Sequence, residues 1–205
     1  MINQENYNKL LEQFWDVASW AMWMPPVGDR PKSNVGSLEI FKDPDLLEKI
    51  NTGFVFVGLN GSGKHNDYLE LNDAWFNFHS SSPRGHDYKL RYALYGTPLW
   101  GSYITDIIKY HQEVDSNKVV KYVRNHPEIL KLNIEAFKEE LGLLGGHPVL
   151  IALGSATYDF LTESFGQEYK IIKIKHYSYT IGKEKYREEL VDALSSVHTT
   201  PEFDF

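Results

Sequence analysis

The sequence predicts an α/β domain of three layers, in which helices cover both faces of a central, mainly parallel, four-stranded sheet. Four segments are rich in apolar and β-branched residues, and stretches with the periodicity of amphipathic helices separate them. Strands that alternate with helices favour parallel pairing, because each helix returns the chain to the same end of the sheet. The expected strands are residues 53–58, 103–109, 148–153 and 169–175.

Helices are expected before, between and after these strands. Residues 3–22 place Leu10 and Phe14 on one apolar face, and the proline pair at 25–26 prevents the helix from continuing. Serine is a favoured N-cap because its hydroxyl accepts from a free backbone N–H in the first turn. The other expected helices are 44–50, 88–94, 117–125 after Ser116, 127–141, 156–165 after Ser155, and 182–197.

Length and composition limit the class of protein. The 205 residues suffice for one sizeable core, so we expect a single domain over 1–205, with residues 1–50 as a helical extension packed on it. The absence of cysteine excludes disulfides, thiolate metal sites and cysteine nucleophiles. The eight histidines are scattered, and we expect neither a metal nor another cofactor. No secretory signal or membrane-spanning apolar run is visible, which predicts a cytoplasmic protein.

The charge is distributed unevenly along the chain. A net charge of −7 argues against a broad nucleic-acid surface. Residues 169–187 nevertheless carry five lysines and one arginine against a single glutamate, a local charge of +5 that leaves −12 for the remainder. A basic patch on an acidic body is compatible with a small footprint on a phosphate backbone. It is equally compatible with a solvated, lysine-bearing strand and helix.

The carboxyl ends of the expected strands are the first place to look for a site, because ligands of parallel sheets bind there. Those ends carry Asn60, Asp106, Gly154 and His176. Residues 61–87 form a long segment rich in aromatic residues, asparagine, serine and histidine. A loop of this length inside a compact domain is usually functional or disordered, and its aromatic content favours a function.

Residues 58–65 read Gly-Leu-Asn-Gly-Ser-Gly-Lys-His and nearly match the phosphate loop G-x-x-x-x-G-K-[ST] after a strand. The backbone N–H groups and Lys64 could hold a phosphate. However, His65 replaces the hydroxyl residue that binds magnesium, and a neutral imidazole is a poor ligand for so hard an ion. A glycine-rich turn that binds nothing explains the same residues. The alternative hypothesis is therefore a non-catalytic protein that binds a nucleic acid or a nucleotide.

Four segments of the chain carry a second set of motifs: Val57-Gly58-Leu59-Asn60-Gly61, residues 103–109, residues 149–156, and Lys175-His176-Tyr177-Ser178-Tyr179. In this order they resemble the uracil-DNA glycosylase superfamily, and the Gly-x-Asn form of the first segment resembles its mismatch-specific branch. The third segment resembles the strand and helix start before the second motif, and the fourth resembles that motif, a His-Pro-Ser type loop. Residues 103–109 resemble the strand that reads the base. The resemblance spans about 53–194, leaves the first fifty residues uncovered, and implies a uracil-DNA glycosylase-like form of the αβα fold.

The resemblance implies hydrolysis of an N-glycosidic bond in DNA base-excision repair, after the target base is flipped out of the helix. Asn60 matches the residue that positions water, and His176 is the candidate donor to an oxygen of the departing base. The candidate base contacts are Phe76, Phe78 and Asp106, and the candidate phosphate or DNA contacts are Gly61, Ser62, Lys64, Ser178 and Tyr179. Structural explanations remain open, because asparagine tolerates a left-handed turn, a histidine can end a strand, and the aromatic residues can belong to the core.

The chain also departs from the pattern of this superfamily. Tyr177 stands where the family has proline, and no leucine wedge follows Ser178, although Tyr179 could fill the gap left by an extruded base. Asp106 stands where the uracil-reading branches carry asparagine. An ionised carboxylate can only accept hydrogen bonds, so it would repel O4 of uracil and suit an exocyclic amino group better. We therefore expect weak or absent uracil activity and an altered base specificity. The target base and the oligomeric state do not follow from the sequence.

Overall fold

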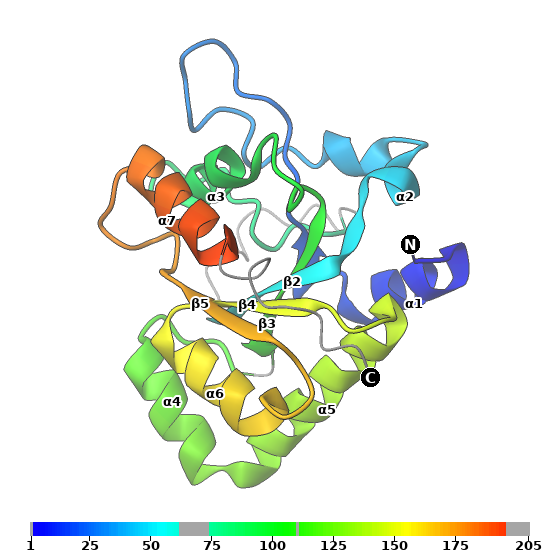
Figure 1. The fold of residues 1–205 in the computed structure, drawn as a ribbon, viewed down its shortest axis with the longest axis vertical. Helices are drawn as coiled ribbons and strands as arrows, with labels where there is room; N and C mark the ends of the chain where they lie inside the picture. Colours follow the sequence, from blue (N-terminus) through cyan, green and yellow to red (C-terminus); the bar gives the residue numbers. More distant parts are fainter. Residues whose placement is uncertain (1, 62–73, 110, 196–205) are drawn as a thin grey trace.

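The computed structural model describes residues 2–61, 74–109 and 111–195, which fold around a five-stranded sheet with helices on both faces (Figure 1). The strands are β1 (Ala18–Trp20), β2 (Asn51–Asn60), β3 (Ser102–Ile108), β4 (Val149–Leu153) and β5 (Ile171–Ile174). The helices are α1 (Gln4–Phe14), the 3-10 helix η1 (Glu39–Lys42), α2 (Leu46–Lys49), α3 (Asp87–Leu94), α4 (Ser116–Asn125), α5 (Pro127–Leu144), α6 (Ser155–Phe165) and α7 (Lys183–Ser195). The α/β class and the three layers are confirmed.

The number of strands differs from the prediction, because the sheet is mixed and has five strands. The additional strand, β1, lies within the segment expected to be one helix over 3–22, so that expectation is wrong beyond Phe14. β1 pairs antiparallel with β3, with Trp20 opposite Tyr103. This pairing satisfies backbone groups on the outer side of β3. It also buries the Trp20 indole completely against Tyr103, with ring centroids 5.0 Å apart.

The strand order β1-β3-β2-β4-β5 locates a point where the winding direction of the chain reverses. From β2 the chain goes to β3 on one side, and it then crosses to β4 on the other side of β2. All three strands run parallel, so their carboxyl ends meet at one edge. Ligands of parallel sheets bind outside such a reversal point, which here lies beyond the ends of β2 and β4.

The two faces of the sheet are covered by different helices. Val55 and Val57 of β2 pack into the core that includes residues of α4, α5 and α6, whereas Phe56 packs into the core that includes residues of α3 and α7. Successive strand residues point to opposite faces, so Gly58 and Asn60 continue the face of Phe56 toward the carboxyl edge. Among the helices that the structure describes, none is long and apolar enough to cross a membrane.

The starts of α4 and α6 differ from the expected serine caps by one residue. Asp115 caps α4, because its carboxylate accepts from the Asn117 N–H at 3.0 Å, and Ser116 is the first helical residue. Before α6, Gly154 occupies the N-cap with a φ of +100°, a backbone conformation that favours glycine, and Ser155 is already helical. The backbone at the end of β4 is therefore free of a side chain.

Candidate functional site

Asn60 is the last residue of β2, and its side-chain amide fastens the segment that follows β3. Its Nδ2 atom donates to the carbonyl oxygens of Gly61 at 2.9 Å, His111 at 3.2 Å and Glu113 at 2.8 Å. An amide nitrogen carries two hydrogens, so these acceptors take up its donor capacity. The Oδ1 atom can only accept, and it can orient a water molecule by accepting one of its hydrogens. The backbone of Asn60 is that of a strand, so the left-handed turn considered from the sequence is wrong.

His176 follows β5, and the geometry around its ring fixes the tautomer. The backbone N–H of Ser178 donates to Nδ1 at 3.1 Å, and the Ser178 hydroxyl lies 2.8 Å from the same atom. A backbone N–H can only donate, so Nδ1 is the acceptor and the hydrogen of the neutral ring is on Nε2. Burial, with a smaller contribution from the charge of His86, lowers the pKa of His176 to about 4. At neutral pH the ring is therefore an uncharged Nε2–H donor.

The surroundings of His176 place it beside the end of β4. A side-chain carbon at Gly154 would lie 3.9 Å from the Cβ of His176. The imidazole also stacks on the ring of the next residue, Tyr177, with centroids 4.2 Å apart and planes inclined by 27°. The bare backbone at Gly154 thus leaves space next to the imidazole, on the β4 side of the reversal point.

Asp106 and Gly58 are paired in the register of β3 and β2, and they lie in close contact. A Cβ atom on Gly58 would overlap Oδ1 of Asp106, so only glycine leaves room for this carboxyl group. The other oxygen, Oδ2, accepts from Nδ2 of Asn77 at 3.3 Å. Burial raises the pKa of Asp106 to about 7, against the opposing effects of Asn77 and the Lys109 charge. The carboxyl group is therefore present in both protonation states near neutral pH, and its neutral form can donate as well as accept.

The two phenylalanines proposed as base contacts lie in different surroundings. Phe78 is buried at 6% exposure with a φ of +65°, and its ring edge would lie 3.6 Å from a Cβ on Gly58. It therefore shares the environment of Asp106. Phe76 instead packs edge-on against Trp15, with centroids 5.8 Å apart. The structure thus brings Phe78, and not Phe76, together with Asp106 at Gly58.

A buried link between two loops was not predicted from the sequence. The carboxyl group of Asp87, at the start of α3, accepts from the Ser80 N–H at 2.7 Å and interacts with the Tyr177 hydroxyl. Burial raises the pKa of Asp87 to about 6. The pKa of Tyr177 is raised by burial and by the charges of Asp87 and Asp106. Tyr177 thus connects the His176 loop with the segment that carries Phe78, at the position where the family motif has proline.

The remaining candidate residues are either exposed or outside the described part of the chain. Ser178 is exposed apart from its contacts with His176, and the side chain of Tyr179 is 58% exposed. A side chain added at Gly61 would meet none of the described residues within 4 Å. Ser62 and Lys64 lie outside the described residues. Of the expected phosphate loop, the structure therefore describes only residues 58–61.

The structure groups these residues into three neighbouring clusters. Asn60 holds the segment 111–113, Asp106 lies with Phe78 at Gly58, and His176 is paired with Ser178. β4 lies between the strands that carry Asn60 and His176, so the two side chains reach the same edge from strands that are not neighbours. Within the described residues, no group of three or more histidine or acidic side chains could hold a metal ion.

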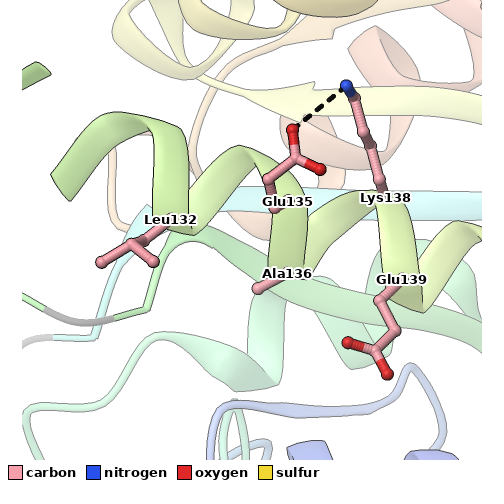
Figure 2. A pocket seen from close by; sticks show the side chains of 5 residues that line it. All are labelled: Leu132, Glu135, Ala136, Lys138 and Glu139. Atoms are coloured by element: carbon pink, nitrogen blue, oxygen red, sulfur yellow. Dashed lines mark hydrogen bonds and ion pairs between the residues drawn. The ribbon is translucent and has the colours of Figure 1, made fainter. Parts of the chain in front are cut away.

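The two best-defined surface hollows do not contain these residues. One, of about 790 Å³, is an open depression along α5 (Figure 2), lined by Leu132, Glu135, Ala136, Lys138 and Glu139. Its charged groups do not converge: Figure 2 shows Glu135 paired with Lys138 at 3.4 Å while Glu139 points away. The other, of about 320 Å³, lies between α4 and α6. Neither combines a concave shape with convergent polar groups, as ligand sites do.

Comparisons of the chain with protein-family models, with curated proteins and with solved structures give no match. Any assignment of function therefore depends on the residues at the carboxyl edge of the sheet and on their chemistry.

Proposed function

We propose that the protein is a uracil-DNA glycosylase-like N-glycosylase, which hydrolyses the bond between a flipped base of DNA and its sugar. The observation that carries this proposal is the state of His176. Its Nδ1 accepts from the Ser178 N–H, and its pKa of about 4 keeps the ring neutral, so Nε2–H is a fixed donor beside the reversal point. Such a donor suits a reaction in which negative charge develops on the departing group.

The proposed chemistry needs two functions from the protein. When the glycosidic bond breaks, its electron pair leaves with the base, and the sugar carbon becomes cationic. The Nε2–H of His176 stabilises the anionic base by a hydrogen bond to a base oxygen, without transferring its proton. Water adds to the sugar carbon, and the proton that it loses neutralises the departed base anion; Oδ1 of Asn60 orients that water. The occupied Nδ2 of Asn60 supports this role, because it fixes the direction in which Oδ1 faces.

Asp106 and Phe78 are the proposed base-recognition residues. Phe78 stacks on the base, and Asp106 contacts its polar edge. Above pH 7 the carboxylate accepts from an exocyclic amino group, whereas below pH 7 the protonated form can also donate to a carbonyl oxygen. The proposal therefore predicts preference for an amino-bearing base at pH 8, with uracil released more readily as the pH falls toward 6.

The test is an abasic-site assay on a panel of DNA duplexes. Each duplex carries one deaminated, alkylated or mismatched base, and alkali cleaves the strand wherever a base has been removed. We expect abasic product from at least one duplex, and a loss of about 100-fold or more in His176→Ala, which removes a preorganised donor, and in Asn60→Ala, which removes the group that positions the water. The exposed His147, which precedes β4 at the opposite edge, gives the matched control His147→Ala with unchanged activity. Abasic product that persists undiminished in His176→Ala would refute the proposed mechanism.

A non-catalytic nucleic-acid or nucleotide-binding protein is the second candidate. It is favoured by the bonds of Asn60, because an amide that holds the segment 111–113 already has a structural role. Binding of DNA or of a nucleotide without abasic product on any duplex would select this candidate.

A further inference from the structure

Three tyrosines lie on α3 and at its end. Tyr88 and Tyr92 are four residues apart, which places them on one face of the helix, and Tyr95 directly follows its last residue. Tyr92 is 37% exposed and Tyr95 is 66% exposed, although large aromatic side chains of a core helix are normally buried. Figure 1 shows that α7 lies beside α3 above the sheet, and that the loop between β5 and α7 leads to it from the carboxyl edge. Tyr179, at 58% exposure, belongs to that loop.

Cationic side chains lie over these rings. The Lys183 ammonium lies 4.4 Å from the centre of the Tyr92 ring, and the Arg187 guanidinium lies 5.9 Å from it. In the same way, Lys32 lies 5.3 Å from Tyr88, and Lys175 lies 5.6 Å from Tyr179. We call the four tyrosines and these four cations the tyrosine–cation surface. Its members alternate flat apolar rings with positive charge.

Part of this charge is not neutralised by acidic side chains. Lys32 donates to the Pro83 carbonyl at 2.6 Å, and Arg187 donates to the carbonyls of Tyr92 and Tyr95 at 2.7 and 2.9 Å. Neither cation has a carboxylate partner among the residues that the structure describes. Three of the four acidic residues on α7 are instead paired with lysines: Glu184 with Lys183, Glu188 with Lys185, and Glu189 with Lys175.

A further cation joins the surface to the candidate site. The Lys89 ammonium donates to the Tyr179 carbonyl at 2.8 Å. Burial and the nearby charge of Lys32 lower the pKa of Lys89, and burial together with both lysines lowers the pKa of His86. His86 in turn contributes to the low pKa of His176. Lys89 is itself buried at 5% exposure, so its contact with the Tyr179 carbonyl holds the His176 loop against α3, beside the more exposed cations Lys32 and Arg187.

We propose that the tyrosine–cation surface binds a single-stranded nucleic acid, with phosphates at Lys32 and Arg187 and bases stacked on the exposed tyrosines. Charge complementarity identifies a polyanion, since cations held by neutral carbonyls keep their full charge for a ligand. The exposed rings select a single strand, because stacking on an aromatic side chain requires bases that are not already stacked and paired in a duplex. The inference rests on the proposed function, because it says where the DNA strand next to the flipped base would lie on the protein.

The test is binding of undamaged oligonucleotides, which requires no cleavage. We would measure the fluorescence anisotropy of a labelled oligothymidylate and of a duplex of equal length, from 50 to 200 mM salt. The single strand should bind at least about ten-fold more tightly than the duplex, with a slope of log affinity against log salt near −1.4, at about −0.7 for each of the two phosphate contacts. Lys32→Gln should reduce the magnitude of this slope by about 0.7, since it removes one contact.

A matched pair of variants distinguishes stacking from general charge. Tyr179→Ala should weaken single-strand binding by about ten-fold, which is the scale of one lost base-stacking contact. Tyr158 on α6 also has a lysine over its ring, Lys173 at 5.2 Å, but it lies on the opposite face of the sheet. Tyr158→Ala should therefore leave affinity unchanged, and thermal unfolding of both variants checks that each is folded.

The outcomes separate this inference from the proposed function. Single-strand binding that depends on Tyr179, without abasic product from any substrate, retains the surface and rejects the glycosylase. Abasic product from duplexes, with equal binding of single strand and duplex, rejects the surface and retains the glycosylase. The absence of measurable single-strand binding at 50 mM salt, or an equal loss in Tyr158→Ala and Tyr179→Ala, also overturns the inference.

Discussion

Two buried carboxyl groups lie on opposite faces of β3, and their surroundings differ. Glu140 of α5 is fully buried, and it accepts from the Tyr103 hydroxyl at 2.9 Å and the Thr105 hydroxyl at 2.8 Å. It also forms an ion pair with Lys109 at 2.6 Å. Asp106, on the other face, accepts one long hydrogen bond from Asn77 at 3.3 Å.

The difference shows that a buried carboxyl group can be fully paired on one face of a strand and have fewer partners on the other. The Lys109 ammonium also donates to the backbone carbonyl of Asp106 at 2.6 Å, but its ion pair is with Glu140. Burial raises the pKa of Glu140, and the Lys109 charge and the two hydroxyls oppose that rise. Glu140 is thus a satisfied structural group, whereas the Asp106 carboxyl group has only the Asn77 amide as a side-chain hydrogen-bond partner among the described residues.

The largest effect is expected from breaking the satisfied pair. Glu140→Gln removes the negative charge and leaves Lys109 buried with its positive charge uncompensated, which costs about 3–5 kcal/mol. Urea unfolding at pH 7 measures the change. The matched variant Glu139→Gln, on the exposed face of the same helix, should change stability by less than about 0.5 kcal/mol. Equal effects of the two substitutions would contradict the structural role of Glu140.

The next effect concerns the pH dependence of stability at Asp106. Its folded-state pKa of about 7 exceeds the ordinary value of 3.8, so between these values the folded protein binds more protons than the unfolded chain. Stability from this group is therefore fully present below pH 4 and is lost as the pH rises to 7. Asp106→Asn should remove this dependence and gain up to about 4 kcal/mol at pH 8, from about three pKa units at about 1.4 kcal/mol each. Denaturant unfolding at pH 5 and pH 8 tests the difference, and parallel pH profiles of the two proteins would exclude it.

A smaller effect is expected from filling the space beside Asp106. Gly58→Ala places a methyl group where Oδ1 of Asp106 lies, which should cost about 1–3 kcal/mol. Gly61→Ala is the control, because its methyl group would meet no atom of the described part of the chain within 4 Å. Thermal unfolding measures both variants. Combining Gly58→Ala with Asp106→Ala should recover part of the loss, and strict additivity would show that the two residues are not in contact.

The sequence predicts the backbone better than it predicts the site. The four parallel strands follow from short apolar runs, and most helices follow from periodicity and turn residues, because these signals are local. β1 was missed because Ala18 fits the helical spacing that begins with Leu10 and Phe14, while its pairing partner Thr105 lies on β3, far along the chain. The backbone groups on the outer edge of β3 need hydrogen-bond partners, but the sequence around residues 14–20 does not show this.

The candidate site illustrates the same limit. Asn60, Asp106 and His176 were found from their places at strand ends. The fit of Asp106 against Gly58 depends on the register between two strands, which local sequence does not specify. Asp87 has the pattern of an ordinary acidic residue in the first turn of a helix, and only its burial beside Tyr177 distinguishes it. In the sequence, Glu140 similarly resembles an exposed helix residue. Only the packing of α5 against β3 shows that its side chain is buried.

The short strand β1 also has a consequence for how this sheet ends. A parallel sheet that stopped at β3 would expose a long row of unpaired backbone groups, a template onto which another chain could add. The three antiparallel residues of β1 cover that row. They are too few to expose a new row of backbone groups long enough for another strand to pair with. At the far side, β5 carries the exposed Lys173 in its middle, a charge that opposes strand addition. We therefore expect concentrated solutions of the protein to resist aggregation through its sheet margins.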